Sequence, residues 1–258
     1  MKNLAKTTIL LAFTGLAAPA LAADMYLSGT LGYLDLGNSK NKGSFMTDFT
    51  TGEVTGVSPP LTIPEGAPVG WSTSFDSGMA YSIAFGWRMD AIRFEIEYAM
   101  SDSDISSHKG VTAAGIDLTN IDAGVLLTGN VGDLGVTVGE LVADGQGSQD
   151  TSTFYLNAYY DFMHDSAFSP YIGAGVGYAD TDVKFMPSGV DVINDSDSGY
   201  SYQFILGASY AFNDRIELFG DMRYRQTEDA SVKSPLLSAG FDVENSDTLF
   251  NLGLRYSF

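Results

Sequence analysis

The chain of 258 residues contains no cysteine, so it has no disulfide, no thiolate metal site and no cysteine nucleophile. It has only two histidines, His108 and His164. Lys and Arg number 13 against 32 Asp and Glu, giving a formal net charge of -19, which argues against nucleic acid as a partner. With 45% hydrophobic and only 17% charged residues, the composition is not that of a disordered chain.

The chain also lacks an apolar run of the roughly 20 residues that a membrane-spanning helix needs. Its first apolar run, 9–18, is shorter, follows Lys2 and Lys6, and precedes the small-residue site Ala20-Leu21-Ala22. This pattern predicts a secretory signal peptide over residues 1–22, cut after Ala22. The remaining residues, 23–258, contain no linker-like stretch, which predicts one domain.

What the chain has instead is alternation of apolar and polar residues. Residues 248–258 are the clearest case, and we interpret them as the closing strand of a membrane barrel. One face of this predicted assembly strand carries large apolar side chains: Phe250, Leu252, Leu254, Tyr256 and Phe258. Seven further segments repeat the pattern: 25–35, 78–88, 91–101, 152–162, 168–179, 200–212 and 215–225.

The connections between these eight segments alternate in length. Residues 36–77, 102–151, 180–199 and 226–247 are predicted long loops, and the remaining three connections are tight turns. Of the prolines after the predicted signal, only Pro170 falls within a segment, at its start. The pattern predicts an all-β fold: an eight-stranded antiparallel up-and-down transmembrane barrel with both termini periplasmic and four long extracellular loops. A soluble lipocalin-like barrel is the alternative, but the inward face is too small and too charged for it.

The stretches FYLNAYYDF (154–162), SPYIGAGVGYA (169–179) and GASYAFNDRIELFGDMRYR (207–225), with the terminal YSF, resemble the small outer-membrane β-barrel family of OmpA barrels, Opa-type opacity proteins and surface antigens. The resemblance covers the strands and not the loops. It implies a barrel with variable surface loops concerned with host contact, envelope integrity or antigenicity. OmpA carries a further peptidoglycan-binding domain, which is not expected here.

Charged residues fall on the faces that would point into the barrel. In an eight-stranded barrel the third and seventh segments lie on opposite walls of a lumen that side chains can fill. Counting from the turns places Arg93 level with Glu217, and Glu97 near Asp221 and Arg223. The predicted lumen charge network comprises Arg93, Glu95, Glu97, Glu217, Asp221, Arg223, Arg225 and Arg255.

Two roles for this network remain open. It is either a static polar core or a gate whose ion pairs exchange to pass small ions. Under the second hypothesis, Arg223→Ala alters conductance.

The predicted loops are rich in Asp and Glu but lack the spacing of a calcium loop, so no metal site is expected. Residues 116–142 are compatible with an extended hairpin, two additional strands or irregular structure. His108 lies close in the sequence to Ser106, Ser107 and Asp104. A hydrolase with a Ser–His pair is therefore conceivable, but sequence proximity is weak evidence for it. His164 is expected to be structural.

The sequence therefore predicts a Gram-negative outer-membrane surface protein of adhesin or surface-antigen type, with no enzymatic activity and no cofactor. The alternative function is a narrow gated ion channel. Expected partners are outer-membrane lipids and lipopolysaccharide, the barrel assembly machinery through the C-terminal strand, and a host surface ligand through the loops.

Overall fold

The computed structural model describes residues 24–50, 62–124 and 134–258. Almost all of its regular structure is β-strand. Eight long strands form the body: β1 (Asp24–Leu36), β6 (Gly78–Met89), β7 (Ile92–Ala113), β9 (Gly147–Asp161), β10 (Phe168–Phe185), β11 (Ile193–Ala211), β12 (Ile216–Ser234) and β13 (Ala239–Ser257). Shorter elements are β2 (Ser39–Phe45), β3 (Phe49–Thr50), β4 (Thr62–Ile63), β5 (Pro68–Phe75), β8 (Ile116–Asp117), the helix α2 (Val138–Val142) and the 3-10 turn η2 (Pro187–Gly189).

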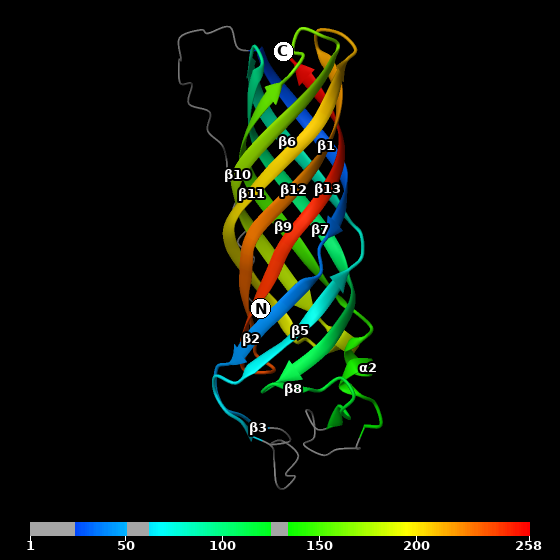
Figure 1. Cartoon of the computed structure of the whole chain (residues 1–258), viewed down its shortest axis with the longest axis vertical. Helices are drawn as coiled ribbons and strands as arrows, with labels where there is room; N and C mark the ends of the chain where they lie inside the picture. The colour runs from blue at the N-terminus through cyan, green and yellow to red at the C-terminus, as the bar shows by residue number, and fades with distance from the viewer. Residues whose placement is uncertain (1–23, 51–61, 125–133) are drawn as a thin grey trace, which may run out of the picture.

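The eight long strands close into an antiparallel barrel (Figure 1). Each long strand pairs with the next one in the chain, and β1 pairs with β13 to close the ring. The expected eight-stranded up-and-down barrel is confirmed. Phe258 donates a backbone hydrogen bond to Met25, so the last strand ends beside the first (3.0 Å). We call the end where these residues and the tight turns lie the turn end, and the opposite end the distal end.

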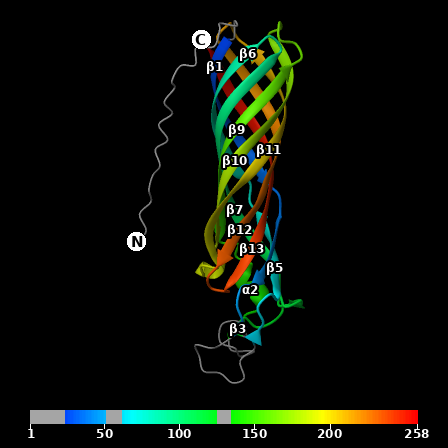
Figure 2. The same cartoon turned by 90° about the vertical axis from the view of Figure 1, so that its left-hand side faces the viewer.

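Two of the eight strands of the barrel are replaced by other strands towards the distal end. β2 pairs with β13 beyond the last residue of β1, and β5 pairs with the far part of β7 beyond the start of β6. Because β2 and β5 also pair with each other, they take the places of β1 and β6 in the ring. The barrel is therefore one long tube, as the two perpendicular views show (Figures 1 and 2).

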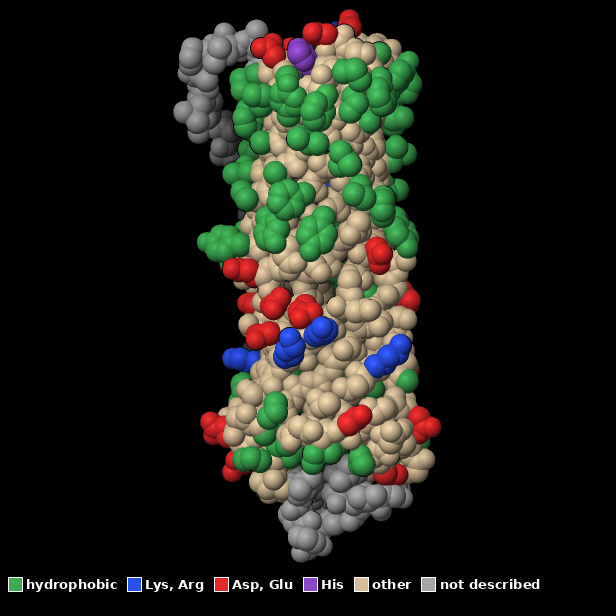
Figure 3. Space-filling view, in the orientation of Figure 1, with side chains coloured by type: hydrophobic (Ala, Val, Ile, Leu, Met, Phe, Trp, Pro, Cys, Tyr) green, Lys and Arg blue, Asp and Glu red, His purple; other side chains and the backbone are tan. Residues whose placement is uncertain are grey.

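An exposed apolar belt surrounds the part of the tube nearer the turn end, and Figure 3 shows one face of it. Its side chains come from every long strand, for example Leu31, Ile83, Val176, Phe204 and Leu252, which are each more than half exposed. We call this part of the tube the belt half, comprising residues 25–33, 79–87, 92–100, 154–162, 168–178, 200–212, 216–224 and 250–258. Each segment has roughly the 9–11 residues that a tilted strand needs to cross a bilayer.

Beyond the belt the barrel changes polarity, which is clearest along β10. In the belt half, Ile172 and Val176 face outward and the glycines between them face inward. Farther along, Asp182 and Lys184 face outward while Phe185 is fully buried. The belt half has its apolar residues outside, whereas the remaining distal half has them inside, as a water-soluble barrel does.

This change of polarity corrects the prediction of four long loops. Most of residues 180–199 and 226–247, and parts of 36–77 and 102–151, continue the strands or form β2 and β5. The predicted segments are those with apolar residues on the outward face, and in the distal half that face is polar. Acidic residues assigned to the third loop, such as Asp180 and Asp182, accordingly lie on the outward face of β10.

In the described part of residues 116–142, no strand enters the barrel ring, and residues 119–123 pair with 136–139 through an antiparallel bridge between Asp122 and Thr137 and neighbouring backbone hydrogen bonds. β8 makes a two-residue ladder with the end of β7, and α2 begins with a capping box between Thr137 and Glu140. Residues 125–133 lie outside the described part. Among the described residues, no helix has both the length and the apolar character to span a membrane.

Candidate functional site

Inside the belt half, polar and aromatic side chains fill the barrel. All eight predicted network residues are less than a tenth exposed. Aromatic rings share this interior and lie against glycines of neighbouring strands. Gly207, for example, leaves the space that Tyr171 occupies, and Gly253 does so for Phe219.

Glu97 and Arg223 join opposite walls of the barrel. The Arg223 Nη1 atom lies 2.7 Å from a Glu97 oxygen, and Arg223 Nε donates to Asp221 at 2.9 Å. Amide groups complete the cluster, because Asn157 donates to Glu97 at 2.7 Å and Gln203 donates to both Glu97 and Asn157. A guanidinium between two carboxylates, with amides on the remaining oxygens, is the arrangement that keeps buried charges satisfied.

Arg93 has a different main partner from the one predicted. Its guanidinium holds both oxygens of Asp161, at 2.8 and 3.0 Å, on the neighbouring strand. It lies between the rings of Tyr159 and Tyr171, 4.5 and 4.8 Å from their centroids. Glu95 is a weaker contact at 3.5 Å. Arg93 is fully buried, so both its charge and its flat faces are covered.

Glu217, which the sequence placed level with Arg93, pairs instead with two other arginines. Arg255 approaches it to 2.6 Å and Arg88 to 2.9 Å. The Arg255 guanidinium also covers the rings of Tyr26 and Phe219, within 4.9 and 4.7 Å of their centroids. This group closes the lumen near the turn end.

Arg225 forms the outermost layer of the network. It binds Asp247 through two hydrogen bonds of 2.7 and 2.9 Å and also donates to Ser101. Altogether five arginines alternate with six carboxylates through the interior. The near balance of charge leaves each described ion paired inside a narrow lumen.

Sequence reasoning missed several members of this network. Asp161 and Asn157 occupied the inward face of a predicted strand, so the alternation could have identified them. Asp247 fell in a predicted loop, and only the extended β13 brings it to Arg225.

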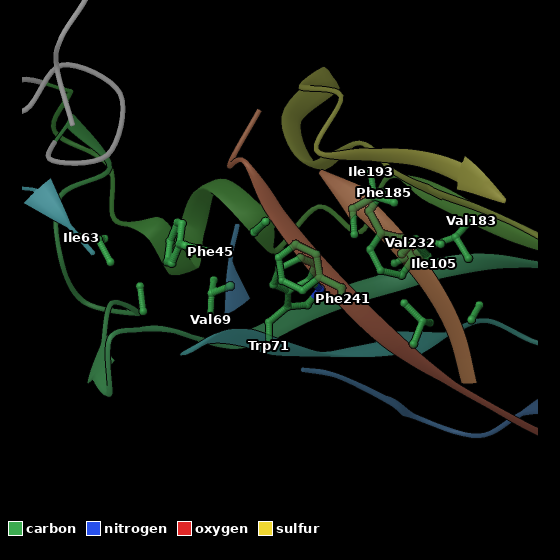
Figure 4. Packing of buried hydrophobic residues seen from close by; sticks show 14 residues of the cluster. Phe45, Ile63, Val69, Trp71, Ile105, Val183, Phe185, Ile193, Val232 and Phe241 are labelled. Carbon is green, nitrogen blue, oxygen red and sulfur yellow. The ribbon is translucent and has the colours of Figure 1, made fainter. Parts of the chain in front are cut away.

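A cluster of apolar side chains lies inside the distal half (Figure 4). The Trp71 ring lies 4.7 Å from that of Phe241 and 6.1 Å from that of Phe185, centroid to centroid. Strands from all sides contribute to this core, including Ile105 from β7 and Val232 from β12. We call it the distal core. It stands in series with the polar network along the barrel.

His108 lies at the edge of the distal core rather than in a loop. It is buried on β7, and its Nδ1 atom is 2.9 Å from the Thr73 hydroxyl. Threonine, and not the neighbouring Ser106 or Ser107, therefore occupies this ring nitrogen. Burial lowers the pKa of His108 to about 4.

The lowered pKa predicts a pH dependence of stability. His108 is harder to protonate in the folded protein than in the unfolded chain, where its pKa is about 6.5. The free energy of unfolding therefore keeps its full value above pH 6.5 and falls as the pH decreases towards 4. The loss amounts to about 3 kcal/mol in full and about 2 kcal/mol by pH 5. Urea unfolding in lipid vesicles at pH 7.5 and 5 measures it. His108→Gln, a neutral side chain, should lack this part of the loss, and equal losses in both proteins would contradict the assignment.

No group of three metal-ligating side chains occurs within the described ranges. A pocket of about 420 Å³ lies at the distal end, between the distal core and the end of the barrel. Trp71, His108 and Phe185 form its inner wall, and Val138 of α2 and Leu236 of the β12–β13 turn are among the outer residues. The segments that build it are far apart in the sequence, which is why no motif indicated it.

Comparison with known proteins identifies the family. A sequence family described as surface antigen matches residues 67–248, more than half of the chain. The chain belongs to this surface-antigen family. The match includes most of both halves of the barrel.

Other comparisons agree with the fold of this surface antigen. The outer membrane protein PagN of Salmonella typhimurium is 30% identical over 118 residues, covering 42% of this chain and 49% of PagN. The match thus spans about half of that relative. The crystal structure of the outer membrane protein OprG from Pseudomonas aeruginosa aligns with a TM-score of 0.55 at 16% identity, over 92% of this chain and 96% of OprG.

Neisserial surface protein A gives a TM-score of 0.46 at 13% identity, over 92% of this chain and 99% of that one. With the family and the relatives established, the surface antigen is a Gram-negative outer-membrane β-barrel. Its apolar belt is the surface that meets lipid.

Proposed function

We propose that this surface antigen displays its distal end outside the cell and binds a partner there, while the belt half is a closed anchor. In this arrangement both termini are periplasmic and the outward charges of the distal half stand in water. Lipid contacts belong to the belt, and lipopolysaccharide would meet its outer edge. Assembly into the membrane would use the outward face of β13 from Phe250 to Phe258, whose apolar side chains are exposed.

One observation carries the proposal of partner binding. Six large apolar side chains are exposed at the distal end, outside the belt: Met46, Ile116, Leu134, Val136, Val190 and Leu236. Figure 3 shows apolar side chains at this end, separated from the belt by a band of charged residues. We call these six residues the distal rim. A protein surface in water that gathers apolar side chains in this way is typical of a site for a protein partner.

A binding experiment tests the proposal. Cells that express the surface antigen are applied to cultured epithelial cells, and attached cells are counted. The triple variant Met46→Asn, Ile116→Asn and Val136→Asn should reduce attachment several-fold, because it removes apolar area from the contact. Met163→Asn at the turn end, also an exposed apolar residue, is the matched control and should attach normally. Attachment of the triple variant at the level of this control would contradict the proposal.

The alternative function, a gated ion channel, is the weaker proposal. A channel needs a continuous aqueous path, and here any path through the polar network leads into the distal core. Ions would have to pass Trp71, Phe185 and Phe241, where an apolar constriction disfavours water as well as ions.

A further inference from the structure

The distal pocket has the size and lining of a small-molecule site. Its volume of about 420 Å³ lies within the range of ligand pockets, roughly 300–1,000 Å³. At ~30 Å³ per group it accepts a molecule of roughly 14 non-hydrogen atoms. Most of the side chains around it are aliphatic or aromatic, so the bulk of such a molecule would be apolar.

Two buried polar atoms on the pocket's wall have no hydrogen-bond partner. They are the indole nitrogen Nε1 of Trp71 and the ring nitrogen Nε2 of His108. Trp71 is 9% exposed and His108 is 3% exposed. Buried polar groups in proteins nearly always have a partner, so this pair points to a group that enters the pocket.

Both atoms can donate a hydrogen bond to such a group. The indole nitrogen can only donate. At His108, Asn41 Nδ2 donates to the Thr73 hydroxyl at 2.7 Å, and this hydroxyl lies 2.9 Å from His108 Nδ1. The Thr73 hydrogen can be donated to Nδ1, and in that tautomer the ring proton is on Nε2.

The charge around the pocket selects among possible acceptors. Asp48 lies on the wall, and Asp144 is close enough to act on the charge of His108. His108 itself is neutral at pH 7 because burial holds its pKa at about 4. An anionic head group would therefore meet negative charge without a cation, which disfavours a carboxylate or phosphate and favours an uncharged oxygen.

We propose that the distal pocket binds a small, mainly apolar, uncharged molecule through one acceptor oxygen, a ketone or an ester, which takes hydrogen bonds from His108 Nε2 and Trp71 Nε1. The pocket adjoins the distal rim and shares Val190 and Leu236 with it, but its ligand would lie inside the barrel end, whereas the rim recognises a partner by its exposed surface. Binding at this site involves neither transport of the molecule nor a chemical change in it.

Fluorescence tests the proposal because the chain has only two tryptophans. The variant Trp87→Phe leaves Trp71 as the sole reporter, on the pocket's wall. It is placed in lipid nanodiscs and titrated with 2-nonanone, with nonane of similar length and with nonanoate. We expect a saturable change with 2-nonanone and about tenfold weaker binding of both nonane and nonanoate. Trp71→Phe, which keeps only Trp87 in the belt half, reports partition into lipid and should give no saturable change.

Two further variants assign the response to the pocket. In the Trp87→Phe background, His108→Leu should weaken 2-nonanone about five- to tenfold and leave nonane unchanged, so that nonane also reports an intact pocket. Val142→Phe, on the outer wall, should weaken both compounds by filling space. Equal binding of 2-nonanone and nonane to the Trp87→Phe protein, tighter binding of nonanoate, or a non-saturable response would overturn the proposal. Normal attachment to epithelial cells alongside any of these results would leave the proposed function standing.

Discussion

Arg223→Met is expected to lower the free energy of unfolding by about 3–5 kcal/mol, the usual loss when one partner of a buried ion pair is removed. Arg223 is 5% exposed and lies 2.7 Å from Glu97 and 2.9 Å from Asp221. Without the guanidinium, two carboxylates remain buried beside uncharged amide, tyrosine and serine donors. Urea unfolding in lipid vesicles, followed by tryptophan emission, measures the change.

Two comparisons separate the ion pair from general damage to the barrel. Adding Glu97→Gln and Asp221→Asn to Arg223→Met removes the stranded charges and should recover a large part of the loss. Arg215→Met, at an exposed arginine of the turn end, should change stability by less than about 0.5 kcal/mol. A triple variant no more stable than Arg223→Met alone would show that charge pairing is not what the network contributes.

Phe185→Ala is expected to cost about 3–5 kcal/mol, as large-to-small substitutions of buried aromatic residues do. Phe185 is fully buried, 6.1 Å from the Trp71 ring and 5.1 Å from the His108 ring, centroid to centroid. Because the distal half has no lipid around it, its strands depend on this apolar core. The effect should therefore be concentrated in the distal half.

Hydrogen exchange locates the effect. Amides in 179–185 and 239–245 should lose protection in Phe185→Ala, while those in 170–178 and 250–257 should keep theirs, since the belt half retains its own network and its lipid contacts. Lys184→Ala, the exposed neighbour on β10, is the matched control and should be near neutral. Equal loss of protection along the whole of β10 would mean that the two halves are one cooperative unit.

The sequence was sufficient for the belt half because a single rule applies there: apolar residues outside, small or polar residues inside. On β13, Leu252 and Leu254 face outward and Asn251 and Arg255 inward, in agreement with the alternation. The same rule failed farther along the strand, where Phe241 and Val243 face inward. Both halves of the strand alternate with a period of two residues, so the pattern alone does not show which face contacts the barrel interior.

Site prediction had a similar limit. The inward-facing charges could be identified as a set, because a charge on a sheet face needs a partner or water. Their pairing could not be predicted. Arg93 was expected to lie level with Glu217 across the barrel, but its guanidinium binds Asp161 on the adjacent strand. The pocket depends on Trp71, His108 and Val138, which are brought together only by tertiary structure.

We propose that the barrel is closed along its whole length and acts through its distal end. Single-channel recording in a planar bilayer, with wild-type protein and Arg223→Ala, tests this claim. We predict no unitary openings for either protein, because the distal core blocks the path even when the polar network is opened. Reproducible openings of the wild type that change in Arg223→Ala would contradict the claim and establish a gated pore lined by the network.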